Sequence, residues 1–342
     1  MAGVLISVRD TAFPKVKRAW LIGSFLLVTS ILHAGDGHGW LHPELASSTY
    51  LTPYTELSGW NPSVSILSCV SAAFNAGGKL EAGLGYDIID QNLVNCELVW
   101  RPLGWLHVRA GIQRAIYLYE TTCSPRYLEA VGYSQSALYL GGYSRDLSGK
   151  NSRSRDCGIT LEGVLLEQDN LPVLSYSFGI FNGNGYRFRD DNRAKDMAGR
   201  IVFQPLKGLK LSLSGMRGFT GEDGALAHRD RLSAACWYDG PRFFFRAENI
   251  FGRTGDQLSN GFFVLGGYWL DGTKALSARL DRFRTDLSDS NSSITRLECC
   301  FTHMLLRKDI SYRIQYTHEC MAAEPGKDIL SFCLILRLSA KI

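Results

Sequence analysis

Residues 176–215, YSFGIFNGNGYRFRDDNRAKDMAGRIVFQPLKGLKLSLSG, contain no helical period, and charged or Gly- and Pro-containing segments interrupt their alternating runs. Within this stretch Leu209, Leu211 and Leu213 alternate strictly with Lys and Ser. Because successive side chains of a strand point to opposite sides, this alternation predicts a β-strand with one apolar and one polar face. The fold must therefore bury its apolar face against a protein core or present it to an apolar surrounding.

The same alternation recurs along the chain, and no segment after the N-terminal region carries a sustained helical stripe of apolar residues. We predict about sixteen strands of about nine to fifteen residues, longer than most strands of soluble sheets and close to what a tilted strand needs to cross a bilayer. The predicted strands are residues 63–74, 78–89, 92–102, 105–119, 134–145, 157–168, 173–183, 196–206, 208–219, 230–239, 242–252, 261–271, 273–285, 294–306, 309–321 and 328–341.

The connections between the later strands alternate in length. Long segments such as NGNGYRFRDDNRAK and RTGDQLSN take turns with short ones such as PLKG and DGT. This rhythm is typical of an up-and-down barrel with short periplasmic turns and longer outer loops. Residues 121–133, TTCSPRYLEAVGY, are long where a short turn is due. Either the first third of the chain holds one strand fewer or more than predicted, or this segment folds inward and narrows a lumen.

The direction of the apolar face decides between a barrel and a sandwich. In RFFFRAE, Phe243 and Phe245 lie on one face, and Arg246 and Glu248 lie on the other. A dry core accepts charges in the middle of a strand only when they are fully paired, whereas a wet lumen accepts them readily. The alternative is an exported β-sandwich whose charged face meets solvent. The number of long strands favours an all-β fold, a transmembrane up-and-down antiparallel β-barrel of about 16 strands.

The same parity predicts the side chains that face the lumen. The predicted basic pore-lining residues are Lys79, Arg101, Arg109, Arg200, Lys210, Arg242, Arg246, Arg279, Arg296, Arg313 and Arg337. The predicted acidic ones are Glu81, Glu97, Glu162, Glu248, Asp281 and Glu298. Because the basic residues are in excess, we expect a mild preference for anions.

The N-terminus resembles an export signal. Four basic residues precede the apolar run AWLIGSFLLVTSILHA, which is about as long as the apolar region of a signal peptide. We predict a signal peptide over residues 1–34 and an outer-membrane barrel over residues 35–342, with a periplasmic lead-in at 35–62. The alternative is a membrane anchor, which usually needs about 20 apolar residues. The net charge of +4 is spread along the chain, so we expect no nucleic-acid partner.

Three segments carry a family resemblance: SRDCGITLEG (154–163), YSFGIFNGNGYRFRDDNRAKDMAGRIVFQPLKGL (176–209) and RFFFRAENIFGRTGDQLSNGFFVLGGYWL (242–270). They resemble the phosphate-selective porin (porin O and P) family of Gram-negative outer membranes, in the form common in Bacteroidetes-type bacteria. The resemblance implies a barrel of about sixteen strands, as a homotrimer in the lipid bilayer of the outer membrane. It also implies passive diffusion of small hydrophilic solutes, including anions such as phosphate.

Other chemistry fits the sequence less well. The loop RFRDDNRAKD is either a solvated surface loop or a vestibule that gathers anions with Arg187, Arg189, Arg193 and Lys195. A barrel with a blocked lumen and a structural or surface-interaction role is the alternative to a porin. An outer-membrane hydrolase would need a general base, for which His107, His228, His303 and His318 are the candidates. No serine is flanked by a nucleophile-elbow pattern, and these histidines are scattered along the chain, so we expect no enzyme. We also expect no cofactor and no metal site.

Overall fold

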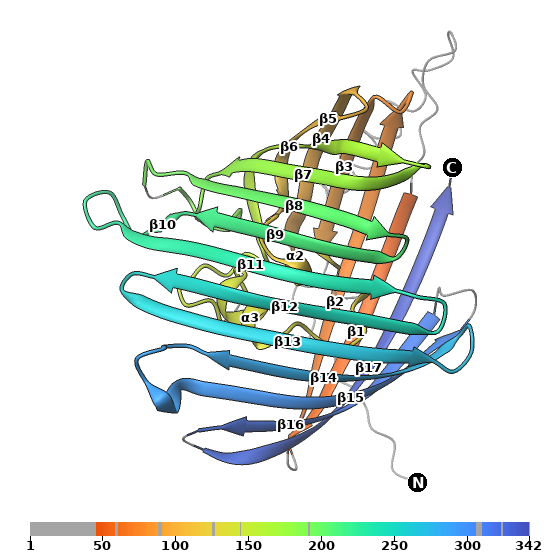
Figure 1. Cartoon of the computed structure of the whole chain (residues 1–342), viewed down its shortest axis with the longest axis vertical. Coiled ribbons are helices and arrows are strands. Elements are labelled where there is room, and N and C mark those ends of the chain that lie inside the picture. The colour runs from red at the N-terminus through yellow and green to blue at the C-terminus, as the bar shows by residue number, and fades with distance from the viewer. Residues whose placement is uncertain are drawn as a thin grey trace, which may run out of the picture. The chain divides into compact units, whose positions relative to one another are not determined.

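The computed structural model describes residues 46–58, 61–87, 91–124, 127–143, 145–190, 192–305, 310–322 and 324–341, all within the compact unit Glu44–Ile342. They form a 17-stranded antiparallel sheet (Figure 1). The predicted signal peptide lies outside the described residues. The strands are β1 (Ala46–Ser58), β2 (Asn61–Ala76), β3 (Leu80–Asp87), β4 (Asn92–Leu103), β5 (Leu106–Arg114), β6 (Arg155–Gln168), β7 (Leu171–Phe181), β8 (Asp196–Leu206), β9 (Leu209–Arg217), β10 (Phe219–Thr220), β11 (Ala227–Asp239), β12 (Phe243–Thr254), β13 (Gln257–Trp269), β14 (Lys274–Arg284), β15 (Ser293–Leu305), β16 (Ile310–Met321) and β17 (Glu324–Lys341).

The strand pairing is up-and-down. Each long strand pairs antiparallel with the next one in sequence, and the two-residue β10 pairs with β11, which also pairs with β9. The first strand pairs with the last, from Ala46↔Lys341 to Ser58↔Ile329, so the pairings form a ring of sixteen long strands. Their connectivity is that of an up-and-down antiparallel β-barrel, and the predicted fold class is confirmed.

Two errors in the predicted strands offset each other. The predicted strand at 134–145 is wrong, because this segment contains the helix α3 (Gln135–Leu140), whose first turn is capped by the Ser134 hydroxyl accepting from Ala137 N–H at 3.2 Å. Conversely, residues 46–58 of the predicted lead-in form β1. The total of about sixteen strands was therefore right although its membership was not.

One predicted long connection is a tight turn. In RTGDQLSN the strands β12 and β13 extend to Thr254 and Gln257, which leaves two residues between them. Gly255 takes a φ of 61° there, a left-handed conformation that glycine adopts without steric cost. The predicted rhythm of long and short connections thus does not hold at this hairpin.

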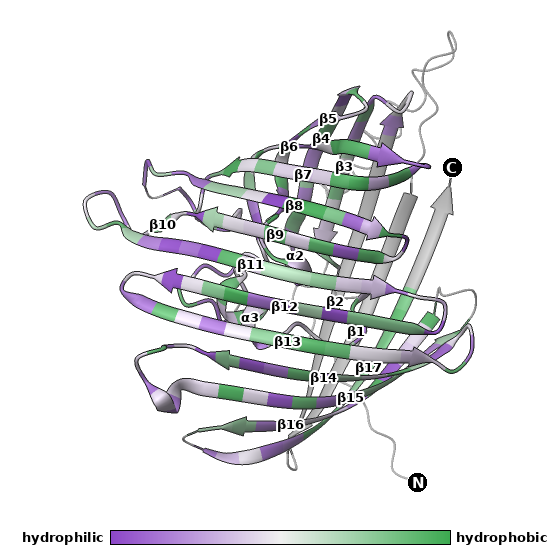
Figure 2. Cartoon of the chain, viewed as in Figure 1, coloured by the Kyte–Doolittle hydropathy of each residue, from purple (hydrophilic) through white to green (hydrophobic). Residues whose placement is uncertain are grey.

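The apolar faces of the strands point outward. Figure 2 shows apolar and polar residues alternating along β12–β15. In β12 Phe243 is 63% exposed, whereas its neighbour Phe244 is 4% exposed. Leu213 and Ile201 are also exposed by more than half, on strands whose alternate residues are buried. A soluble sandwich would bury this face, so the outward apolar surface favours a bilayer as its surrounding. None of the helices in the described part of the chain has the length and hydropathy of a membrane span.

The close approach of β4 and β5 at Gly111 gives a first test. Gly111 has a φ of +118°, and a Cβ there would lie 2.1 Å from the carbonyl oxygen of Cys96. We expect Gly111→Ala to lower the free energy of unfolding by about 2 kcal/mol or more. The measurement is the fraction of protein that migrates as the folded barrel in gel electrophoresis without heating, followed against urea concentration. Gly104→Ala is the control, because nothing lies within 4 Å of a Cβ at Gly104. Equal midpoints for the two variants would contradict this account.

Candidate functional site

Residues 115–154 connect β5 to β6, and we call them the lumen loop. Its described residues lie against the inward faces of the barrel wall. The loop contains the short helices α2 (Tyr119–Thr122) and α3. Both helices lie behind the front strands β11–β13 in Figure 1. The predicted inward-folding segment, residues 121–133, is part of this loop, and the loop also includes the residues that had been predicted as a strand.

Side chains of the wall provide hydrogen-bond acceptors for the backbone of the lumen loop. Three loop N–H groups donate to them at 2.7 Å each: Tyr119 to Glu248, Val131 to Gln315 and Gln135 to Asp281. In the other direction, Ser214 Oγ donates to Tyr117 O at 2.6 Å, and Ser277 Oγ donates to Glu129 O at 3.0 Å. These bonds satisfy buried backbone groups that have no strand or helix partner. The loop is therefore a bonded part of the barrel interior.

Arg279 of β14 is the most buried ionic anchor of the lumen loop. Its Nε lies 2.5 Å from Glu298 of β15, and its Nη1 lies 3.2 Å from Glu120 of α2. All three side chains are at most 3% exposed. Burial raises the pKa of the Glu120 carboxyl above its ordinary value, and the Arg279 charge opposes this rise. Without Arg279, these two buried carboxylates would lose the cation that pairs with them.

A second anchor lies on β12. The guanidinium of Arg246 forms an ion pair with Glu129 of the lumen loop and another, at 2.5 Å, with Asp239. Nearby, Arg200 donates to Thr122 Oγ1 at 3.0 Å and lies over the Trp237 ring. Arg200, Arg246 and Arg279 were predicted as pore-lining residues, and the structure shows that all three contact the lumen loop.

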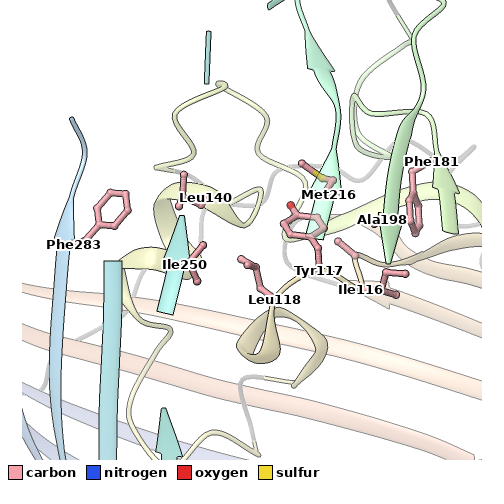
Figure 3. Packing of buried hydrophobic residues seen from close by; sticks show 10 residues of the cluster. Ile116, Tyr117, Leu118, Leu140, Phe181, Ala198, Met216, Ile250 and Phe283 are labelled. Atoms are coloured by element: carbon pink, nitrogen blue, oxygen red, sulfur yellow. The ribbon is translucent and has the colours of Figure 1, made fainter. Parts of the chain in front are cut away.

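An apolar cluster fixes the middle of the lumen loop to the wall. Figure 3 shows Leu118 and Leu140 of the loop among Ile250, Phe283 and other wall residues. Leu140 lies over Gly252, where a Cβ would be 2.7 Å from a Leu140 methyl carbon. The glycine therefore makes the space into which the leucine packs.

The wall formed by β3–β6 keeps its inward charges partly exposed. Arg109 lies between Glu97 and Glu162, at 2.7 Å from each, and its side chain is 27% exposed. Arg101 pairs with Glu81 at 2.6 Å, and these side chains are 29% and 34% exposed. By contrast, the charged residues beneath the lumen loop are almost fully buried. The accessible inward surface therefore follows β3–β6, and we call it the exposed wall.

The other predicted pore-lining residues are dispersed. Lys79 and Arg242 are exposed in the turns at 77–79 and 240–242. Lys210 is half-buried on β9, and Arg313 is buried on β16. Arg296 of β15 pairs with Glu319 at 2.5 Å. Arg337 belongs to β17, in a part of that strand whose side chains the structure does not describe.

Two of the predicted vestibule residues lie near acidic side chains. Arg193 is 96% exposed and lies 3.8 Å from Asp223, while Lys195 pairs with Asp190. Arg187 is half-buried and Arg189 is exposed. The structure thus gathers these residues in the loop between β7 and β8.

The four histidines considered for catalysis lie on separate strands. His303 Nδ1 is 3.1 Å from the Tyr312 hydroxyl, and His318 Nδ1 is 2.8 Å from the Asp328 carboxylate. His228 lies 3.8 Å from Asp230, and His107 is on β5. Within the described ranges no His forms a hydrogen bond to a serine, so these residues do not pair a serine nucleophile with a general base.

Sequence reasoning missed the loop-side residues of this site. Glu120 and Glu129 carry the acidic half of the two loop anchors, and neither was among the predicted lumen residues. Strand parity applies only to strands, so it says nothing about side chains of a connecting segment. The available signal was the unusual length of the 121–133 segment.

The sequence matches no protein-family model and no curated protein. Its fold is similar to that of an anion-selective porin from Comamonas acidovorans, with TM-score 0.61 and 11% identity over 86% of this chain and 98% of the porin. It is also similar to OmpF of Salmonella typhi, in complex with daunomycin, with TM-score 0.63, 10% identity and 86% and 97% coverage. A third similar structure is the trimer form of OmpT, an outer membrane protein of Vibrio cholerae, with TM-score 0.63, 10% identity and 87% and 100% coverage. The chain thus has the fold of Gram-negative outer-membrane porins.

The buried ion pairs of Arg279 predict how the lumen loop can be released. Arg279→Met removes the one cation that forms ion pairs with Glu120 and Glu298 among the described residues. We expect a loss of about 3–5 kcal/mol in the free energy of unfolding and faster cleavage of the lumen loop by added protease. Arg242→Met, in an exposed turn, is the control. Unchanged stability and cleavage in Arg279→Met would show that the pair does not hold the loop.

The position of the lumen loop also predicts the effect of its deletion. Removing residues 121–133 takes away α2 contacts and the Glu129 anchor, so the space between the loop and the exposed wall should widen. We expect a larger single-channel conductance in a planar bilayer than for the full chain. Conductance that stays the same would place this segment outside the conducting path.

Proposed function

We propose that this chain is a porin of a Gram-negative outer membrane that gives passive diffusion of small hydrophilic solutes, with a weak preference for anions. The observation that carries the proposal is the partial exposure of the inward charges on the exposed wall, while the lumen loop covers the charges on the opposite strands. Charged side chains of this kind hold water in a lumen. A passive channel requires no catalytic group, and we propose no enzymatic activity.

The outward face supports the proposed location. Exposed Leu, Ile and Phe side chains cover the outside of β6–β9 and β11–β17, and among the described residues the first strand pairs with the last. Hydrocarbon accepts such a surface and excludes unpaired backbone groups. The fold shared with outer-membrane porins agrees with this location.

The preference for anions is the finer part of the proposal. On the exposed wall, Arg101 and Arg109 are neutralised by glutamates, so they contribute little net charge. Arg114 and Arg155, opposite each other at the ends of β5 and β6, donate instead to neutral oxygens: Arg114 to the carbonyls of Thr121 and Cys123, and Arg155 to the Asn95 amide. These two guanidinium groups keep their positive charge, which attracts anions. The resemblance to phosphate-selective porins makes phosphate the first anion to test.

The reversal potential under a salt gradient tests this proposal. We expect stepwise conductance of the refolded barrel in a planar bilayer, and a reversal potential whose sign shows a preference for anions. A homotrimer, like the trimer form of the Vibrio cholerae OmpT, should give conductance steps in groups of three. Arg155→Gln keeps a donor to Asn95 but removes the charge, so the ratio of anion to cation permeability should fall about twofold or more.

The control for this measurement is Arg217→Gln, an exposed arginine at the end of β9 that points away from the lumen. It should leave the permeability ratio unchanged. A sealed, silent barrel would overturn the channel and favour a structural or surface-interaction barrel whose lumen the loop blocks. A conducting barrel with cation preference would overturn only the anion preference.

A further inference from the structure

Three polar side chains interrupt the apolar outer face of β12–β14, next to the outward arginines Arg253 and Arg284 at the strand ends. Asn249 and Arg282 are exposed and Asn260 is half-buried. Arg282 lies between Asp281 and Phe283, which are both fully buried, so its side chain points away from the lumen. We call Asn249, Asn260 and Arg282 the outer polar patch. Hydrocarbon cannot satisfy amide or guanidinium groups, so their position on this face needs a polar partner.

The sheet register places the three residues on three adjacent strands of the outer face. Phe262 of β13 pairs with Asn249 on one side and with Arg282 on the other, so these two are about 10 Å apart across two strand spacings. Asn260 Nδ2 donates to Asn249 Oδ1 at 2.8 Å and to Ile250 O at 2.9 Å. Both amides are thereby oriented, and the Asn249 amide N–H groups remain available as donors.

Arg282 has no hydrogen-bond or ion-pair partner among the described residues. Its cross-strand neighbours are Phe262 and Thr295, and its diagonal neighbours are the apolar Val264 and Leu297 and the polar, uncharged Asn260 and Ser293. No carboxylate therefore lies beside it on the outer face. The uncompensated charge and the oriented amide together form a donor set that is complementary to an anion.

The position of the outer polar patch along the strands indicates whether the anion is a lipid headgroup or a free ion. Arg282 lies two residues before the end of β14 on the side of the longer loops, where a long arginine side chain reaches the headgroup region. One outward position further from the loops, Val264, Leu280 and Leu297 are 40%, 39% and 53% exposed. A polar donor set above an apolar strip fits a lipid whose headgroup is anionic and whose chains run along the strip.

We propose that the outer polar patch binds the phosphate group of a lipid in the loop-side leaflet, with the acyl chains against Val264, Leu280 and Leu297. The phosphate accepts from the Arg282 guanidinium and the Asn249 amide, and Asn260 holds that amide in place. This inference rests on the proposed membrane location and not on conduction through the lumen.

The test compares two lipids that differ only in the phosphate. The refolded full-length barrel is mixed in detergent with phosphatidic acid or with diacylglycerol of the same chains, and retained lipids are counted by native mass spectrometry. We expect about tenfold higher retention of phosphatidic acid by the wild type, and loss of this difference in Asn249→Leu with Arg282→Leu. Arg217→Leu, which removes an exposed arginine elsewhere on the outer face, should retain the lipid as the wild type does. Arg282→Lys should retain an intermediate amount, because it keeps the charge without the planar donor pair.

Several results would overturn the proposal. The proposal fails if the double variant retains as much phosphatidic acid as the wild type. It also fails if Arg217→Leu loses as much lipid as the double variant, because this would indicate unspecific attraction to positive charge. Complete displacement by millimolar inorganic phosphate would assign the patch to a free anion. A change of oligomer mass in the double variant without lipid loss would assign it to a second copy of the chain. Conductance of the same preparations separates these outcomes from failure of the channel proposal, because the patch variants should conduct as the wild type does.

Discussion

A sheet with an apolar outer face can stay in hydrocarbon only if its backbone groups are paired within the protein, and the pairing of β1 with β17 meets this requirement. Because the ring of pairings satisfies the backbone, the outward side chains are free to be Leu, Ile and Phe. The inward side chains must then include the polar residues of every alternating strand. The charges of the lumen are thus a consequence of the same alternation that makes the outside apolar.

Charges inside a narrow barrel need either water or partners. Over β8–β16 the lumen loop supplies partners, with Glu120 for Arg279 and Glu129 for Arg246. Along β3–β6 the side chains remain partly exposed and pair across neighbouring strands, as Arg109 does with Glu97. The loop therefore divides the interior into a buried side along β8–β16 and an accessible side along β3–β6. Both sides contain pairs of arginine and glutamate, which are buried on the first side and partly exposed on the second.

The sequence predicted the strands far better than the site. Alternation placed β6–β9 and β11–β17 within a few residues, since long amphipathic strands have a strict period of two. It failed for α3, because polar and apolar residues also alternate over part of SALYLG. The helix is indicated by Ser134, whose side chain caps its first turn. It also failed for β1, whose residues ASSTYLTPYTELS were assigned to a lead-in. Parity put Arg246 and Arg279 on the inward side, but which inward residues a loop covers depends on tertiary packing, which strand parity does not contain.

The ion pairs reduce the net positive charge that the excess of basic residues gives to the lumen. A fixed charge attracts counter-ions in proportion to what its neighbours leave uncompensated, so a count of arginines overstates the field in the lumen. Arg109 with two glutamates is locally negative, whereas Arg114 and Arg155 with amide and carbonyl partners keep a positive charge. In the proposed channel, the few arginines whose partners are neutral would therefore set the selectivity. Arginines that pair with glutamates of the lumen loop, such as Arg246 and Arg279, would affect it only through the width that the loop leaves open.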